Sequence, residues 1–141
     1  RGMDFVLKDM KVSFKGESID VPKVKVNIDF QNGDFRARAV DEKVKFQHAH
    51  PHIMSDYRAC TGNFTTIFPK LVANSRFNQV VELLIQFFES YNQDSPATQW
   101  HYYRYAMKNN LSREEVHDTD TGVKAQREWA DYLEKLKKQP A

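Results

Sequence analysis

The chain has 141 residues, of which 21 are Lys or Arg and 19 are Asp or Glu, so its formal charge is +2. This near-neutral charge gives no broad electrostatic argument for nucleic acid, and the single cysteine, Cys60, excludes an internal disulfide framework. No stretch approaches the ~18 to 20 consecutive apolar residues of a membrane span, and the N-terminus lacks the pattern of a signal peptide. We therefore expect one domain of a cytoplasmic protein, with no membrane and no nucleic acid among its partners.

Strands are expected over about residues 5–50, because apolar and polar residues alternate there with the period of two that half-buried strands show. Gly16 offers a turn after the first run, and Asn32-Gly33 predicts a type I′ hairpin turn after the second. Pro51 lacks an amide donor, so regular pairing is expected to end near it. Four strands of an antiparallel meander are predicted, at residues 10–14, 24–30, 35–39 and 44–48.

Helices are expected over about residues 77–138, where apolar residues recur at three-and-four spacing. The strongest pattern predicts a helix over 77–91 that lies across the sheet and is stopped by the segment from Asn92 to Pro96. Further helical stretches are predicted at 97–108, at a capping box formed by Ser112 and Glu115, and at 122–137. Strands followed by helices indicate one α+β domain, with the helices packed on one face of an antiparallel sheet.

The most informative segment joins the two halves and lies in a predicted loop over residues 50–76. It begins with His50-Pro51-His52, and Cys60 stands ten residues after His50. The segment closely resembles the active site of ubiquitin-conjugating enzymes, in which a His-Pro-Asn tripeptide follows the last strand of a meander and the catalytic cysteine comes ten residues after its His. The order of a crossover helix, an Asn/Asp-Pro loop and further C-terminal helices is also similar. The compact form looks most like divergent bacterial and phage relatives.

The resemblance implies an acyl transferase without a cofactor. Cys60 would accept the C-terminal carboxyl of a ubiquitin-like protein from an activating enzyme, and an amine of a protein target would then attack the thioester. Such chemistry needs a thiolate, a donor for the oxyanion and a polar group near the amine. His52 occupies the place of the family's Asn, which implies the donor role, and His50 is expected mainly to shape the turn. Asp94 and Asn92 are candidates to orient the amine.

Two other interpretations remain open at this point. The altered tripeptide and the missing N-terminal helix of the family also fit an RWD-like interaction or structural module, which keeps the architecture without the chemistry. His48, His50 and His52 have the spacing of three imidazoles on one strand face, which suits zinc or copper with Cys60 nearby. Pro51 argues against the metal site, because it bends the strand and removes the common face.

Overall fold

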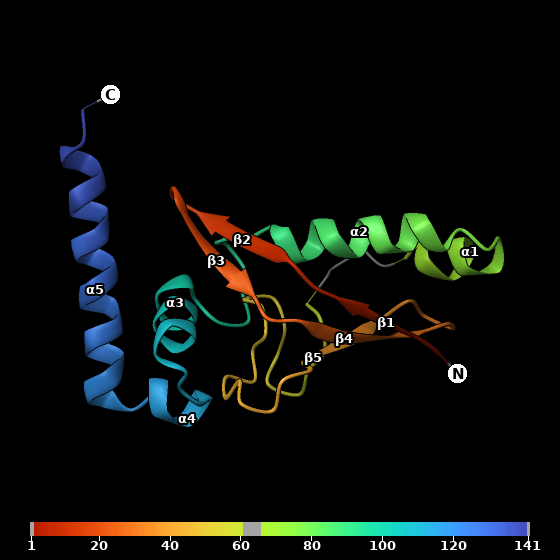
Figure 1. Cartoon of the computed structure of the whole chain (residues 1–141), viewed down its shortest axis with the longest axis horizontal. Coiled ribbons are helices and arrows are strands. Elements are labelled where there is room, and N and C mark those ends of the chain that lie inside the picture. The colour runs from red at the N-terminus through yellow and green to blue at the C-terminus, as the bar shows by residue number, and fades with distance from the viewer. Residues whose placement is uncertain (1, 61–65, 141) are drawn as a thin grey trace.

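The computed structural model describes residues 2–60 and 66–140, and its fold is α+β (Figure 1). Residues 61–65 of the predicted loop over 50–76 lie outside the described residues. The strands are β1 (Gly2–Leu7), β2 (Met10–Phe14), β3 (Glu17–Val21), β4 (Val24–Asp29) and β5 (Phe35–Ala39). The helices are α1 (Phe68–Ala73), α2 (Phe77–Glu89), α3 (Trp100–Asn109), α4 (Arg113–Val116) and α5 (Thr119–Lys138). No helix in this described part of the chain is both long and apolar enough to cross a membrane.

The expected single four-stranded meander is replaced by two sheets, a three-stranded sheet in the order β1-β4-β5 and a two-stranded sheet of β2 and β3. The two sheets share one pairing register. Leu7 of β1 pairs with Val24 of β4, and three residues later in the chain Met10 of β2 pairs with Val21 of β3, which lies three residues before Val24. Together they form one long antiparallel hairpin that is interrupted where Asp9 has a φ of 60° and where Pro22 follows β3. Proline cannot donate to the ladder, which explains the break.

The type I′ turn occurs at the tip of this long hairpin and not at Asn32-Gly33, where we predicted it. Phe14 pairs with Glu17, and the two residues between them, Lys15 and Gly16, have φ angles of 51° and 76°. Positive φ at both central residues is the property of a type I′ turn. Of Asn32 and Gly33 only Gly33 has a positive φ, at 78°, and its N–H bonds to the Asp29 carbonyl at 2.9 Å. The hairpin between β4 and β5 is confirmed, but five residues, 30–34, separate the two strands.

The fourth predicted strand, residues 44–48, is wrong, because the backbone there finds other partners. The Lys45 N–H donates to Asn110 Oδ1 at 3.1 Å, and Asn110 Nδ2 donates to the Lys43 carbonyl at 3.0 Å. The edge of β5 is instead occupied by the segment that precedes Cys60. The Ala37 N–H donates to the Tyr57 carbonyl at 2.8 Å, and the Ala59 N–H donates to the Phe35 carbonyl at 2.9 Å.

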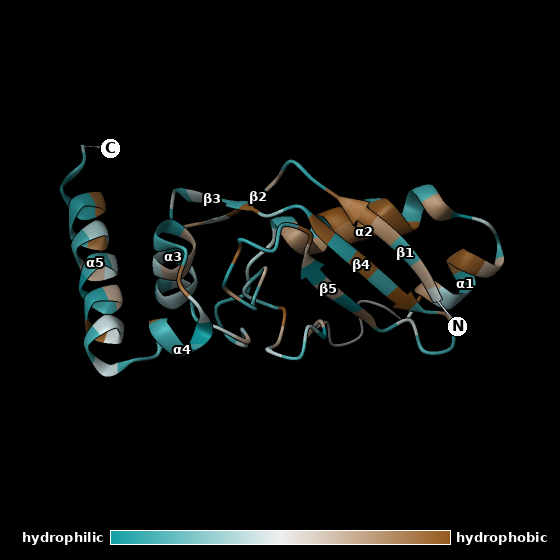
Figure 2. Cartoon of the chain, turned by 60° about the horizontal axis from the view of Figure 1, so that its bottom comes forward, coloured by the Kyte–Doolittle hydropathy of each residue, from teal (hydrophilic) through white to brown (hydrophobic). Residues whose placement is uncertain are grey.

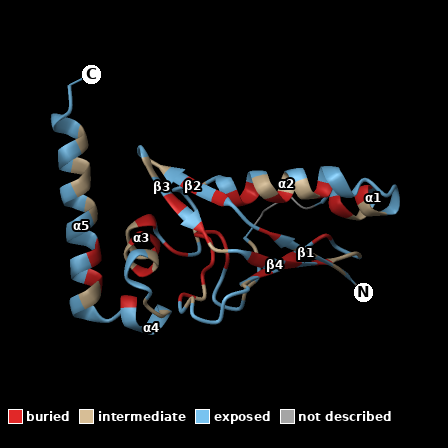
Figure 3. Cartoon of the chain, viewed as in Figure 1, coloured by how far each residue is buried: buried red, intermediate tan, exposed pale blue. Residues whose placement is uncertain are grey.

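The main core lies between α2 and the inward faces of β4 and β5, as the hydropathy and burial views show (Figures 2 and 3). α2 buries Val80, Leu84, Phe87 and Phe88. Phe35 of β5 packs edge-on against Phe87, with 5.1 Å between the ring centroids. The prediction of a helix near 77–91 lying across the sheet is therefore confirmed. α1, which the sequence analysis left within a loop, adds Phe68 and Leu71 to this core.

The C-terminal helices pack on the other end of the molecule and hold the tip of the long hairpin. Glu17 accepts from Arg104 Nε of α3 at 2.7 Å, and Arg104 also pairs with Glu128 of α5 at 3.1 Å. Tyr132 of α5 donates to the Lys15 carbonyl at 3.1 Å. The predicted capping box is confirmed, because the Ser112 side chain accepts from the Glu115 N–H and the Glu115 side chain accepts from the Ser112 N–H.

Candidate functional site

Cys60 is a free and exposed thiol, and hydrogen bonds hold its own N–H and the segment that precedes it. Residues 53–59 form a miniature hairpin, in which Ile53 bridges Ala59 and the Met54 N–H donates to the Arg58 carbonyl at 2.8 Å. The second arm of this hairpin is the segment that pairs with β5. Cys60 follows at once, and its own N–H donates to the His52 carbonyl at 2.8 Å. The position of the cysteine is thus fixed by the sheet and by the predicted tripeptide.

The turn of the miniature hairpin depends on Tyr57, which sequence analysis did not single out. Its φ of 73° is left-handed, and its N–H bonds to the Met54 carbonyl at 2.9 Å. A three-residue hairpin loop requires a left-handed third residue, a position that glycine usually fills. A tyrosine carries a conformational cost there, and no pattern in the sequence indicated it.

His50 is completely buried and binds at both ring nitrogens. Its Nε2–H donates to the Ser90 carbonyl at the end of α2, at 2.9 Å, while its Nδ1 accepts the His52 N–H at 3.0 Å. Burial, followed by the neighbouring His52, lowers the pKa of His50 to about 3. The ring is therefore neutral at physiological pH, and it ties the tripeptide turn to the end of the crossover helix.

His52 is also buried, and it joins the tripeptide to the other predicted site residues. Its Nε2 accepts the backbone N–H of Asn92 at 2.9 Å, and Asn92 Oδ1 accepts the N–H of Asp94 at 3.0 Å. Burial lowers the pKa of His52, while a hydrogen bond with the Ser95 backbone acts in the opposite direction. The ring is thus a neutral anchor for the loop over residues 90–95. Asn92 and Asp94 themselves are exposed at the surface of that loop.

A second anchor for this loop is the carbonyl of Pro51, which sequence analysis considered only for its missing donor. It accepts the N–H of Ala97 at 2.9 Å and the N–H of Thr98 at 3.0 Å. The tripeptide therefore holds the chain on both sides of the predicted helix stop, through the ring of His52 and through the carbonyl of Pro51. Carbonyls have two lone pairs, so accepting two donors satisfies this one fully.

The three histidines that could have formed a metal site each bind a different part of the backbone. His48 Nδ1 lies 2.6 Å from the Ile53 carbonyl, and His50 and His52 bind the groups described above. Burial lowers the pKa of His48 as it does for the other two. Within residues 2–60 and 66–140, no group of three His, Cys, Asp or Glu side chains is arranged to hold a metal ion.

Comparison of the chain with protein-family models, with curated proteins and with solved structures finds no match in any of the three. The resemblance to ubiquitin-conjugating enzymes therefore stays a prediction from the tripeptide, the spacing to Cys60 and the order of the elements. The geometry adds that His50, His52, Asn92 and Asp94 form one connected network, which meets Cys60 through the His52 carbonyl.

Proposed function

We propose that Cys60 carries a ubiquitin-like protein as a C-terminal thioester and passes it to an amine of a target protein. The observation that supports this proposal is an exposed thiol whose backbone N–H is held by His52, the same residue whose ring holds the polar loop over residues 90–95. Acyl transfer requires a nucleophile that an incoming protein can reach and that does not move away from the groups around it. The ten-residue spacing from His50 supports the same function through the family resemblance.

The chemistry needs two substitutions at one carbonyl carbon. In the first, the Cys60 thiolate attacks the thioester that an activating enzyme presents, the new S–C bond forms, and the enzyme's thiolate leaves. In the second, a lysine amine attacks the Cys60 thioester, the C–N bond forms, and the Cys60 thiolate leaves while the amine gives up a proton. Both substitutions pass through a tetrahedral oxyanion, which a nearby hydrogen-bond donor stabilises.

Asn92 is the residue that we assign as this donor, in place of His52. The Nε2 of His52 accepts the Asn92 N–H and so holds the 90–95 loop, which makes His52 a positioning residue. Asn92 uses its Oδ1 to accept the Asp94 N–H, which leaves the amide NH2 of the same exposed side chain as a donor. The backbone of Asn92 is fixed by His52, so this amide is held on the loop that the resemblance sets beside the cysteine.

Asp94 is the candidate for orienting the amine. Its carboxylate is exposed, and its own N–H is fixed by Asn92 Oδ1, so the start of its side chain is held in place. A carboxylate accepts hydrogen bonds from an amine, and it attracts the ammonium form of a lysine. Replacing Asp94 by Asn removes the charge and keeps the shape, so this variant tests the role of the charge.

The test uses a ubiquitin-like protein ending in Gly-Gly, prepared as its mercaptoethanesulfonate thioester, so that no activating enzyme has to be known. The wild-type chain is expected to form an adduct that reductant cleaves, and Cys60→Ser is expected to give none or an ester that resists reductant. Adding free lysine should then discharge the wild-type adduct. Asn92→Asp keeps the acceptor for the Asp94 N–H but loses the NH2 donor. It should slow discharge roughly 10²- to 10³-fold, the typical effect of one oxyanion donor.

Asn92→Ala is the matched control, since it removes both the donor and the acceptor. If Asn92→Asp discharges at the wild-type rate while Asn92→Ala is slow, the loop geometry and not the donor is what matters. Iodoacetamide labelling of the native protein checks the accessibility of Cys60 independently. A thiol that labels readily but forms no adduct with the thioester would contradict the transferase.

The alternative function is that of an RWD-like interaction or structural module. The observation that favours it is the buried ring of His52, whose Nε2 is used to hold the Asn92 N–H and whose pKa is lowered by burial, which disfavours a charged imidazole beside the thiol. In that case Cys60→Ser would leave every binding property of the protein unchanged. A carrier and a module are therefore separated by the same set of Cys60 variants.

A further inference from the structure

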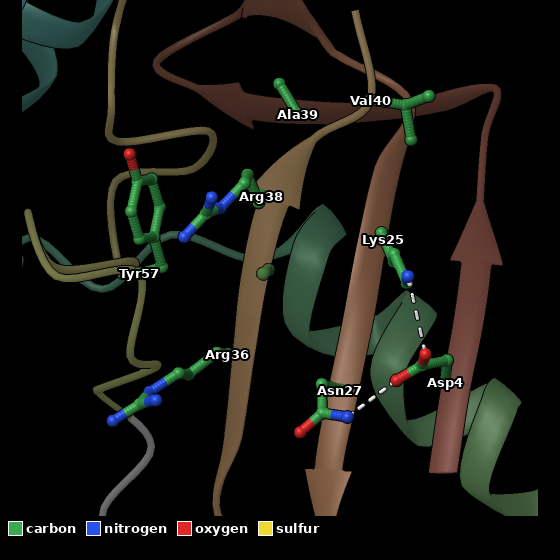
Figure 4. A pocket seen from close by; sticks show the side chains of 9 residues that line it. Asp4, Lys25, Asn27, Arg36, Arg38, Ala39, Val40 and Tyr57 are labelled. Carbon is green, nitrogen blue, oxygen red and sulfur yellow. Dashed lines mark hydrogen bonds and ion pairs between the residues drawn. The ribbon is translucent and has the colours of Figure 1, made fainter.

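The face of the three-stranded sheet that lies opposite α2 is hollowed into a pocket of about 540 Å³. Figure 4 shows Lys25, Arg36 and Arg38 on this face, with the ring of Tyr57 beside Arg38 and the ribbon of α2 behind the sheet. The guanidinium of Arg38 lies 4.0 Å from the centroid of the Tyr57 ring.

The strand register arranges the cations of this face in two adjacent rows. In one row Lys25 stands directly opposite Arg38, and in the next row Arg36 bridges Arg58. Residues opposite each other in an antiparallel pair have Cβ atoms about 4.5–5.5 Å apart, and like charges at that separation destabilise the sheet. Two such pairs therefore lie side by side on one face. We call Lys25, Arg36, Arg38 and Arg58 the basic band.

The carboxylates near the basic band neutralise only half of it. Asp4 pairs with Lys25 at 3.5 Å, and Asp56 pairs with Arg58 at 2.7 Å. Within the described residues, 2–60 and 66–140, Arg36 and Arg38 have no carboxylate within ion-pair distance. Two guanidiniums, each able to bind a carboxylate through two parallel hydrogen bonds, are thus left on an open surface.

The residues that flank the basic band restrict the kind of ligand that can bind to it. On one side are Val6 and Val40, whose exposed fractions of 56% and 45% are among the largest of the apolar residues. On the other side Asp29 and Asp34, opposite each other where β4 meets its turn, repel an anion. Among the described residues that line the pocket, the one aromatic ring is that of Tyr57, and Arg38 covers one of its faces, which limits the surface for stacking a base.

We propose that the basic band binds a short acidic peptide segment with an apolar residue at one end. Its carboxylates pair with Arg36 and Arg38, and its apolar residue packs on Val6 and Val40. The basic band does not include Cys60, so the peptide is expected to bind whether or not Cys60 carries an acyl group. It is an interaction surface for a protein with an acidic tail or loop.

The test measures fluorescence anisotropy of a labelled hexapeptide of four acidic residues followed by two leucines. Wild type and Cys60→Ser should bind it equally, and binding should weaken as salt rises because exposed charges are screened. Arg36→Gln with Arg38→Gln should weaken binding roughly tenfold, the sum of two exposed charge pairs. The matched control is Lys124→Gln with Arg127→Gln, which removes the same charge from exposed positions of α5 and should leave the affinity unchanged.

Three outcomes would overturn the proposal. Equal weakening by the two double variants would mean that only the net charge attracts the peptide. Equal affinity for a peptide with Gln and Asn in place of the acids would remove the role of the carboxylates. Tighter binding of single-stranded oligothymidylate, lost in the Arg36 and Arg38 variant, would assign the face to nucleic acid. Thermal melting of each variant confirms its folding, and we expect no loss of stability when like charges are removed.

Discussion

At the scale of single residues, His50 has the greatest influence on the candidate site without touching a substrate. It is buried and neutral, and its two ring nitrogens connect the Ser90 carbonyl to the His52 N–H. His52 in turn fixes both Asn92 and the N–H of Cys60. A neutral imidazole can donate at one nitrogen and accept at the other, and this is the combination that the site uses.

Replacing His50 by Leu should therefore destabilise the protein by about 2–4 kcal/mol, because the buried His52 N–H and the part-buried Ser90 carbonyl lose their partner while the volume is nearly kept. Urea unfolding monitored by circular dichroism measures this change. Ser55→Ala, an exposed substitution in the miniature hairpin, should change stability by no more than about 0.5 kcal/mol. A similar small change for His50→Leu would mean that the ring nitrogens contribute nothing to stability.

At the scale of elements, the long hairpin is held at its tip by an ion pair and not by apolar packing alone. The side chains of Arg104 and Glu17 are only 8% and 11% exposed. Trp100 Nε1 donates to the same Glu17 carboxylate at 3.2 Å, and Lys108 pairs with it at 3.7 Å, so α3 holds it through three residues. Lys11 and Asp20 form a second ion pair on the same hairpin, but their side chains are 68% and 83% exposed.

Removing Arg104 takes its closest cation from the buried Glu17 carboxylate and leaves it only Lys108, at 3.7 Å, so Arg104→Met should cost up to about 3–5 kcal/mol. Lys11→Met, the matched change in the exposed pair, should cost less than about 1 kcal/mol. The double variant Arg104→Met with Glu17→Met should be more stable than Arg104→Met, because the charges that lose a partner, on Lys108 and Glu128, are about half exposed and not buried. Chemical denaturation measures the free energy of unfolding of these variants. If the double variant lost as much stability as the two single substitutions added together, Arg104 and Glu17 would act independently.

At the scale of the whole molecule, the histidines make stability depend on pH. Burial lowers the pKa of all five, which are His48, His50, His52, His101 and His117. In the unfolded chain their pKa returns to about 6.5, so between that pH and their folded pKa the unfolded state binds more protons. The contribution of the neutral histidines to the free energy of unfolding is then fully present above about pH 7 and is lost as the pH falls. For His50 the loss continues down to about pH 3.

We expect the free energy of unfolding to be nearly constant from pH 8 to 7 and to fall from pH 6.5 to 5, by at most about 1.4 kcal/mol per pH unit for each histidine. Urea titrations at several pH values measure the slope. His52→Gln keeps an acceptor for the Asn92 N–H and should make the slope shallower, whereas His117→Gln, at an exposed position, should change it little. Stability that increases on acidification over this interval would contradict buried neutral rings.

Local patterns in the sequence determined the elements whose interactions are themselves local. The alternation over β4, the three-and-four spacing of α2 and the Ser112 and Glu115 box each depend on residues a few positions apart, and all three are present. The α+β class follows from the order of these elements. The ten residues from His50 to Cys60 also form one segment, in which the cysteine N–H bonds back to the tripeptide.

Tertiary structure alone decided which backbone segments pair and what each histidine binds. Residues 44–48 alternate as a strand should, but Asn110, some 65 residues away, binds their backbone, and the segment before Cys60 takes the edge of β5. In the same way His52 reaches Asn92 across 40 residues, which makes it an anchor instead of a free donor. A sheet edge and an imidazole each have few hydrogen-bonding positions, and several segments compete for them. The outcome depends on distances in space that the order of residues does not contain.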